Sequence, residues 1–323
     1  MKWRGVIKNL LRPGRDLILI VGGFAYDYYR FFKYGGWHKR DHERLNFFLV
    51  KIYHRIEKSL TFREQKLGAG IENAKALRAQ LHDKNFEKNS LSFHEKTALK
   101  VLNDFALQYQ GSAKDVGDIK EFCEKFLSHI PSHGGAKSYS QELLLAGKLE
   151  NPEQFFLSRY SVRDFDSKKV DVDLIKRAIN LALKTPSACN RQAWHVYHLS
   201  QRERIDQALS LQNGNRGFGR DVQCLLIIAA DLRAFDTASE RYQHWIDGGM
   251  FSMSLVLALH SLGLASCCLN WSKGPIDDIK LRKILKVQGS HSILMMLAVG
   301  YASDELKVCY SARRPIDEIY TSI

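Results

Sequence analysis

The sequence predicts an α/β or α+β fold, a sheet covered by helices, preceded by an all-helical N-terminal extension. Residues 41–150 carry apolar residues at helical spacing, whereas after residue 150 helical segments alternate with short apolar strands. The 323-residue chain is 45% hydrophobic, which suits about two globular domains with real cores and excludes a disordered polymer. We expect a leader over 1–40, a helical extension over 41–150 and a third domain over 151–323.

The net charge of +13 is concentrated near the start of the chain. The first 40 residues hold nine basic and two acidic residues, while residues 151–323 have a net charge of only +4. A basic leader on a nearly balanced protein indicates an anionic partner for the leader, and no nucleic-acid-binding domain is predicted. The six cysteines form no Cys-x-x-Cys pair, so no metal site is expected. We expect a cytoplasmic protein, since a disulfide framework is not predicted at this size.

Residues 1–12 have the pattern of a basic amphipathic helix. Its apolar residues recur at helical spacing: Trp3, Val6, Ile7, Leu10 and Leu11. Pro13-Gly14 is expected to end this helix. The helix either makes a peripheral contact with the inner face of an anionic membrane or docks on the protein's own surface. The uncharged stretch Leu17–Tyr26 is too short to span a bilayer, and no signal peptide is predicted.

Four helices are predicted in the extension, over 41–60, 66–82, 92–108 and 114–130. Gly, Asn, Ser or Pro residues separate these segments, and such residues interrupt helices. The stretch Pro131–Ser138 is the best candidate for a linker to the third domain.

The third domain is predicted to alternate between helices and strands. Helices are expected over 171–184, 246–262 and 276–286, and strands over Trp194–Leu199, Cys224–Ala230, Leu264–Leu269 and Ile293–Val299. The run Cys224–Ala230 is continuously apolar, which indicates a strand buried on both faces. Gly248-Gly249, inside the long apolar helix, indicates close packing against another backbone, such as that of a second subunit.

Two arginine clusters are candidates for binding an anion. Arg159, Ser161 and Arg163 occupy every second position, so in an extended segment their side chains would point to one side. A guanidinium group can donate two parallel hydrogen bonds to a phosphate. The alternative is an exposed basic edge strand. Near the end of the chain, Arg313 either clamps a phosphate or belongs to a solvated basic tail.

A third polar cluster, Thr185–Trp194, follows a helix and precedes a strand. Its Ser187, Asn190 and Gln192 supply hydrogen-bond donors and acceptors at a turn. These groups suit the edge of a flat heteroaromatic ring, or they serve ordinary turn chemistry.

Four motifs together resemble the nitroreductase-like FMN flavoproteins, over about residues 152–323. They are Arg-x-Ser-x-Arg-x-Phe (159–165), Pro-Ser-x-x-Asn-x-Gln-x-Trp (186–194), Ser-Leu-Gly-Leu-Ala-Ser-Cys (261–267) and Arg-Arg-Pro-x-x-Glu (313–318). The resemblance implies a helix-covered α+β domain and a homodimer that binds FMN at its interface. It also implies an oxidoreductase in which NAD(P)H reduces the flavin and the flavin reduces a small-molecule substrate.

The resemblance also implies roles for individual residues on the phosphate side of FMN. Arg159, Ser161 and Arg163 would contact the phosphate, ribityl or pyrimidine side, and Arg313 would hold the phosphate. Because the flavin itself performs the hydride transfer, no catalytic side chain is demanded.

A second group of residues is implied at the isoalloxazine ring. Ser187, Asn190 and Gln192 would approach the ring, partly from the other subunit. Leu269 and Asn270 would place backbone amides near flavin N5.

Two residues depart from the simple members of the family, Cys189 and Arg191. Arg191 either recognises an anionic substrate or pairs with a carboxylate, and Cys189 is interpreted as a packing residue.

In the extension, the stretch His54–Leu60 resembles a subgroup from bacterial surface-polysaccharide biosynthesis, which implies a redox step on a sugar-linked intermediate. Its alternative is a solvated, salt-bridged helix face. The alternative function is a flavin-binding, membrane-associated scaffold without turnover.

Overall fold

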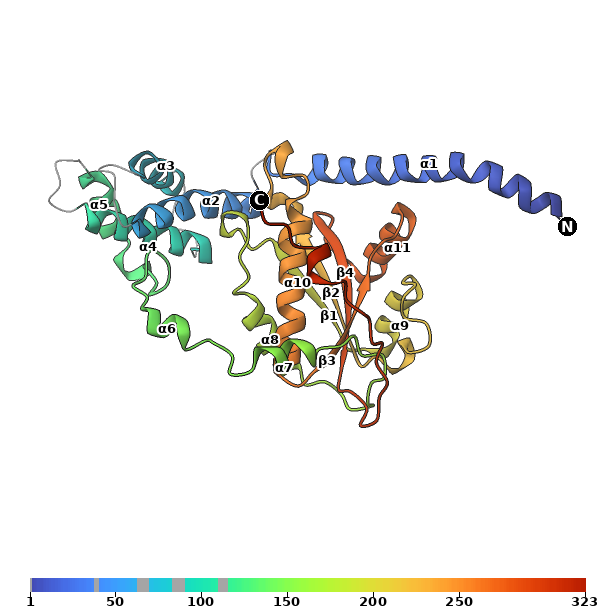
Figure 1. Ribbon diagram of the computed structural model, residues 1–323. Coiled ribbons are helices and arrows are strands. Elements are labelled where there is room, and N and C mark those ends of the chain that lie inside the picture. Colours follow the sequence, from blue (N-terminus) through green and yellow to red (C-terminus); the bar gives the residue numbers. More distant parts are fainter. Residues whose placement is uncertain (1, 38–40, 63–69, 83–90, 110–115) are drawn as a thin grey trace.

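The computed structural model describes residues 2–37, 41–62, 70–82, 91–109 and 116–323. A long helix, α1 (Lys2–Tyr34), leads into a group of helices and then into a region built on one sheet (Figure 1). The predicted α+β fold class, with helices first and a helix-covered sheet after them, is confirmed.

The helices that follow α1 pack around an apolar core of their own. They are α2 (His42–Thr61), α3 (Ile71–His82), α4 (Phe93–Gln108) and α5 (Gly117–Glu124). Asp41 caps α2 by accepting from the backbone N–H of Arg44, and Ser92 and Glu95 form a capping box at the start of α4. Their apolar stripes meet in a core that includes Leu49, Leu99 and Phe105, which are fully buried.

The predicted helices 41–60 and 92–108 are confirmed, and 66–82 is confirmed for its described part. The prediction for 114–130 was too long, since α5 ends at Glu124 and only a short 3₁₀ turn, η1 (Leu127–His129), follows. The stretch Pro131–Ser138 contains neither helix nor strand. Two short exposed helices, α6 (Gln141–Leu145) and α7 (Pro152–Leu157), then lead to the sheet region.

The sheet has four antiparallel strands in the order β1-β2-β4-β3. They are β1 (Trp194–Leu199), β2 (Cys224–Asp231), β3 (Ala265–Asn270) and β4 (His291–Gly300), each within two residues of its predicted bounds. Every residue of β2 is buried, as the continuous apolar run predicted.

Helices cover both faces of this sheet (Figure 1). On one face lie α8 (Val172–Ala182) and α10 (Gln243–Ser261), whose apolar side chains pack on alternate residues of β2 such as Leu226 and Ile228. On the other face, α9 (Arg202–Ser210) and α11 (Pro275–Leu285) pack on the intervening residues, Leu225 and Ile227. The helices predicted over 171–184, 246–262 and 276–286 are therefore confirmed as α8, α10 and α11.

The helix α1 runs unbroken through Pro13-Gly14, so the prediction that it ends there was wrong. Proline removes one backbone donor and strains the preceding turn, which kinks a helix without obliging it to stop. The last third of α1 is anchored on the sheet region. Arg30 is buried and donates from Nη2 to the carbonyl oxygen of His291 at 2.8 Å, and the Tyr26 hydroxyl donates to Asp278 at 2.7 Å.

The middle of α1 projects from the body of the protein (Figure 1), and its residues 17–26 include no charged side chain. Five consecutive aliphatic side chains, Leu17–Val21, are exposed, and Ile18 reaches 73%. Within the described residues, no helix is both long enough and apolar enough to cross a membrane. The side chains of residues 1–12, for which we predicted an amphipathic face, lie outside the described part of the chain.

Candidate functional site

The first arginine cluster lies against strand β3. Ser161 pairs with Ser266, and the backbone N–H of Val162 donates to the Ser266 carbonyl oxygen at 3.0 Å. Val162 turns into the core, while its neighbours Ser161 and Arg163 stay at the surface. Arg159 lines a cavity of about 490 Å³ whose walls include Ser266 and Val308. Ser161 and Val162 thus alternate beside the strand edge, while Arg159 shares its cavity with Tyr160 and Val162, so a common side for Arg159, Ser161 and Arg163 stays a prediction.

The C-terminal segment runs along the same cluster. Phe165 pairs with Ala302, the Ser303 hydroxyl donates to Asp164 at 2.7 Å, and the Arg163 guanidinium lies 3.5 Å from the Cys309 sulfur. Arg313, four residues beyond Cys309, is exposed and donates to the carbonyl oxygen of Ser311. The structure thus brings Ser303 and Cys309 of the C-terminal segment to the first cluster, while the contact of Arg313 is within its own turn.

The third polar cluster is a tight loop that ends at β1. Three of its residues have left-handed backbones without being glycine: Cys189 (φ 54°), Asn190 (φ 54°) and Gln192 (φ 51°). Such conformations cost about 1 kcal/mol or more each and persist where the surroundings fix them. Hydrogen bonds to the Ser187 and Asp247 side chains help to hold the loop. The Gln192 N–H donates to the Ser187 hydroxyl at 3.0 Å, and the Ala188 N–H lies 3.2 Å from an Asp247 carboxylate oxygen.

The buried side chain of Arg191 also holds this loop through hydrogen bonds. Its side chain is only 1% exposed and donates to Glu240 at 2.6 and 3.2 Å and to the Ala234 carbonyl oxygen at 2.8 Å. Burial alone would raise the pKa of Glu240, but the hydrogen bond and charge of Arg191 outweigh it, so this pKa lies below its usual range. Of the two roles predicted for Arg191, the structure shows the pairing with a carboxylate. Cys189 is half-buried.

Leu269 and Asn270 end strand β3. The Leu269 side chain is in the core, whereas Asn270 is exposed and its carbonyl oxygen accepts from the Gln212 side chain at 3.0 Å. Asn270 also lines a cavity of about 680 Å³ between the β3–α11 loop and α1, whose walls include Phe24 and Lys273. Sequence reasoning missed Gln212, because nothing in its own neighbourhood marks a contact 58 residues away.

The strand register separates the first cluster from the third. Trp194, at the end of the loop, pairs with Ala230, which in turn pairs with Ser292 at the start of β4. Ser266, beside the first cluster, pairs with Val299 at the other end of β4. The two clusters therefore lie at opposite ends of one sheet, with Asn270 nearer the loop's end.

A buried polar network at the loop's end of the sheet was not predicted. The Tyr197 hydroxyl lies 2.7 Å from His291 Nδ1, and Asp231 lies 3.5 Å from His291 Nε2 and 2.6 Å from an Arg233 nitrogen. Burial alone would raise the pKa of Asp231, but the hydrogen bonds from His291 and Arg233 outweigh it and lower that pKa. Since Arg30 of α1 also binds the His291 carbonyl oxygen, this network anchors α1 to the sheet.

In the extension, His54 and Glu57 interact as their spacing predicted. Their side chains approach to 3.0 Å, and the other Glu57 oxygen accepts from the Gly135 N–H at 3.2 Å. This pair is half-buried and ties the predicted linker to α2, so it is more than a solvated helix face.

Comparison with known proteins gives matches in the sheet region. The model of the nitroreductase family matches residues 157–211 and 201–301. A candidate NADH dehydrogenase/NAD(P)H nitroreductase from Archaeoglobus fulgidus is 22% identical over 161 residues, which are 49% of this chain and 88% of that protein. The iodotyrosine dehalogenase 1 homolog of Caenorhabditis elegans is 25% identical over 191 residues, covering 50% of this chain and 58% of that protein.

A solved FMN-dependent nitroreductase from Clostridium difficile is 19% identical, with a TM-score of 0.45, and the match covers 52% of this chain and 98% of that chain. The sheet-containing part of this chain, residues 157–301, is similar to the nitroreductase family. The matched range contains the first cluster, the loop and the end of β3, but it stops before Arg313.

Proposed function

We propose that this chain is an FMN-dependent oxidoreductase that takes hydride from NAD(P)H and reduces a small-molecule acceptor. The observation that carries the proposal is the nitroreductase-family match, which spans three of the four predicted flavin-contacting segments. The Archaeoglobus fulgidus relative, described as an NAD(P)H nitroreductase, supports the choice of reductant.

The residues present fit such a cofactor. Arg159, Ser161 and Arg163 offer cationic and hydroxyl donors along one strand edge, as a phosphate and a polyol chain require. The strained loop presents Asn190 and Gln192, and Asn270 borders a cavity wide enough for an aromatic ring. When bound, FMN would supply the hydride chemistry, while these residues bind and orient it.

We propose that two copies of the chain complete the site. Because the first cluster and the loop lie at opposite ends of the sheet, one copy does not bring them to one flavin. The helix α10 presents an exposed apolar face, with Ile246, Met250 and Met253, and Gly249 has open space around it. A homodimer joined through this face would bury these residues.

The purified protein tests the proposed function. We expect it to be yellow or to take up added FMN, and to oxidise NADH or NADPH. Stable flavin with no nicotinamide oxidation would favour the alternative, a flavin-binding scaffold without turnover.

The predicted boundaries at 40 and 150 remain part of this proposal. Separate apolar cores, one in 49–123 and others after residue 162, support a helical domain followed by a flavin domain.

A role in surface-polysaccharide biosynthesis is supported by the His54–Leu60 stretch alone. We also propose a cytoplasmic location.

We further propose a peripheral contact of α1 with an anionic membrane, at the inner face. Predicted for residues 1–12, it gains support from the exposed aliphatic residues Leu17–Val21, which follow a strongly basic stretch. A second copy of the chain, with a net charge of +13, would repel that stretch, whereas anionic lipid would attract it.

The double substitution Ile18→Asp and Ile20→Asp tests this contact. Because two side chains would lose their burial in lipid, we expect at least about tenfold weaker co-sedimentation with vesicles of phosphatidylglycerol and phosphatidylethanolamine. The control is Leu144→Asp with Leu157→Asp, which changes the charge equally at exposed positions outside α1. Equal binding of both double variants would contradict the proposal.

A further inference from the structure

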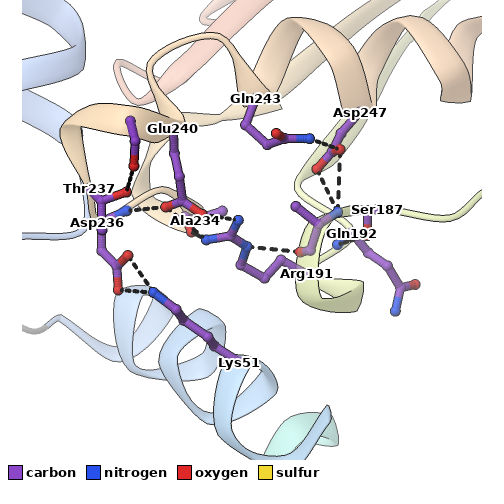
Figure 2. Close-up of polar contacts among 12 residues, drawn as sticks. Lys51, Ser187, Arg191, Gln192, Ala234, Asp236, Thr237, Glu240, Gln243 and Asp247 are labelled. Atoms are coloured by element: carbon purple, nitrogen blue, oxygen red, sulfur yellow. Dashed lines mark hydrogen bonds and ion pairs between the residues drawn. The ribbon is translucent and has the colours of Figure 1, made fainter. Parts of the chain in front are cut away.

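Two ion pairs, joined by a backbone hydrogen bond, connect the N-terminal helices to the strained loop (Figure 2). Lys51, on α2, lies 2.7 and 3.0 Å from the two carboxylate oxygens of Asp236. The backbone N–H of Asp236 donates at 3.1 Å to Glu240, and the same Glu240 oxygen accepts from Arg191. Each link is a direct contact, so the charge on α2 is connected to the loop through only two intervening residues.

The last of these links returns to the loop backbone. Arg191 Nε donates to the Ala188 carbonyl oxygen at 3.0 Å, while its other nitrogens are held by Glu240 and by the Ala234 carbonyl oxygen. A buried guanidinium whose three nitrogens are all hydrogen-bonded is held in one orientation. The loop backbone around Ala188 is therefore fixed by where Glu240 is placed.

Apolar packing reinforces the same contact. Phe235, which is fully buried, lies under the Arg191 guanidinium at 5.0 Å and shares a small core with Ala193 and with Phe47 of α2. The helix α2 thus makes two contacts here: Lys51 pairs with Asp236, and Phe47 packs against the small core that contains Phe235. The left-handed backbones of Cys189, Asn190 and Gln192 need such a rigid surrounding.

We propose that the helical region is a brace for this loop: the relay Lys51–Asp236–Glu240–Arg191 holds Ser187, Asn190 and Gln192 in the conformation that meets the flavin. The contact with flavin rests on the proposed function, whereas the bracing of the loop does not. Lys51, Asp236, Glu240 and Arg191 are positioning residues in this account. The N-terminal helices, which the nitroreductase-family match does not include, thereby gain a role in the site.

The substitution Lys51→Met tests the brace, because it removes the charge and keeps most of the aliphatic stem. The matched control is Lys100→Met, which breaks an equally close ion pair, with Asp104, on α4. The readout is hydrogen exchange at the backbone amides of Asn190 and Arg191, which are bonded to Ser187 and Ala188 within the loop. We expect exchange about 3–10-fold faster in Lys51→Met, near wild type in Lys51→Arg, and unchanged in Lys100→Met.

Unchanged loop exchange in Lys51→Met would overturn the proposal. Amides of the buried strand β2 report global unfolding, and if they accelerate equally, Asp236→Asn repeats the test with a smaller change. FMN affinity is the second readout, with about 3–10-fold weaker binding expected for Lys51→Met and recovery in Lys51→Arg. If the wild-type protein binds no FMN, the proposed function fails, and the exchange result still decides whether α2 braces the loop.

Discussion

Replacing Arg159 and Arg313 together with alanine will abolish FMN retention during purification. Each arginine is proposed to make a charge-assisted hydrogen bond to the flavin phosphate, and two such bonds contribute about 3–6 kcal/mol. This loss corresponds to roughly 10²–10⁴-fold weaker binding. The measurement is the dissociation constant from quenching of FMN fluorescence, with flavin absorbance of the purified protein as a second check.

A charge-matched control separates this effect from the loss of two positive charges. Lys176, on α8, and Lys75, on α3, are exposed cations outside both arginine clusters, so their joint replacement with alanine should leave FMN affinity unchanged. If both double variants bind FMN like the wild-type protein, the phosphate does not lie between Arg159 and the C-terminal segment.

The largest effect on stability is expected for Gly248→Leu. A Cβ atom at Gly248 would lie 1.9 Å from Leu294 Cδ1, where α10 packs on β4, so a leucine side chain has no room there. Overpacking of this kind costs about 1–3 kcal/mol or more. The free energy of unfolding from urea denaturation measures it, and adding Leu294→Ala should restore part of the loss.

The neighbouring glycine is the control. No atom lies within 4 Å of a Cβ atom at Gly249, and both glycines are in the interior of α10. Gly249→Ala should therefore raise the free energy of unfolding by about 0.5–1 kcal/mol, since alanine favours the helix. Destabilisation by Gly249→Ala equal to that of Gly248→Leu would show that the Leu294 contact is not the cause. The close packing at Gly248 is against the Leu294 side chain of the same chain, and not against another backbone as predicted.

Local patterns predicted the four strands and the covering helices α8, α10 and α11, but not α9. The run in β2 is apolar at every position but its last, Asp231, and β1 places apolar and aromatic residues around His195 and His198, so each element carried its own signal. The prediction failed at Pro13, because a proline weakens one turn while the flanking turns keep their hydrogen bonds. Whether a helix ends at a proline depends on the balance between the turn that is weakened and the hydrogen bonds kept in the flanking turns, and composition alone does not give this balance.

The site shows a different limit. Motifs located Arg159, Ser161 and the loop, because those residues are close together in sequence. The partner of Arg191 is Glu240, 49 residues away, and the partner of Asp231 is His291, so neither contact leaves a local pattern. The same holds for Lys51 and Asp236, 185 residues apart, which join the two halves of the protein.

The absorbance spectrum of the purified protein, followed by stopped-flow mixing with NADH and with NADPH, tests the central claim most directly. The account predicts flavin absorbance at about one FMN per chain, bleached by at least one of the two nicotinamides and restored when an electron acceptor is added. A colourless protein that takes up no added FMN would contradict it.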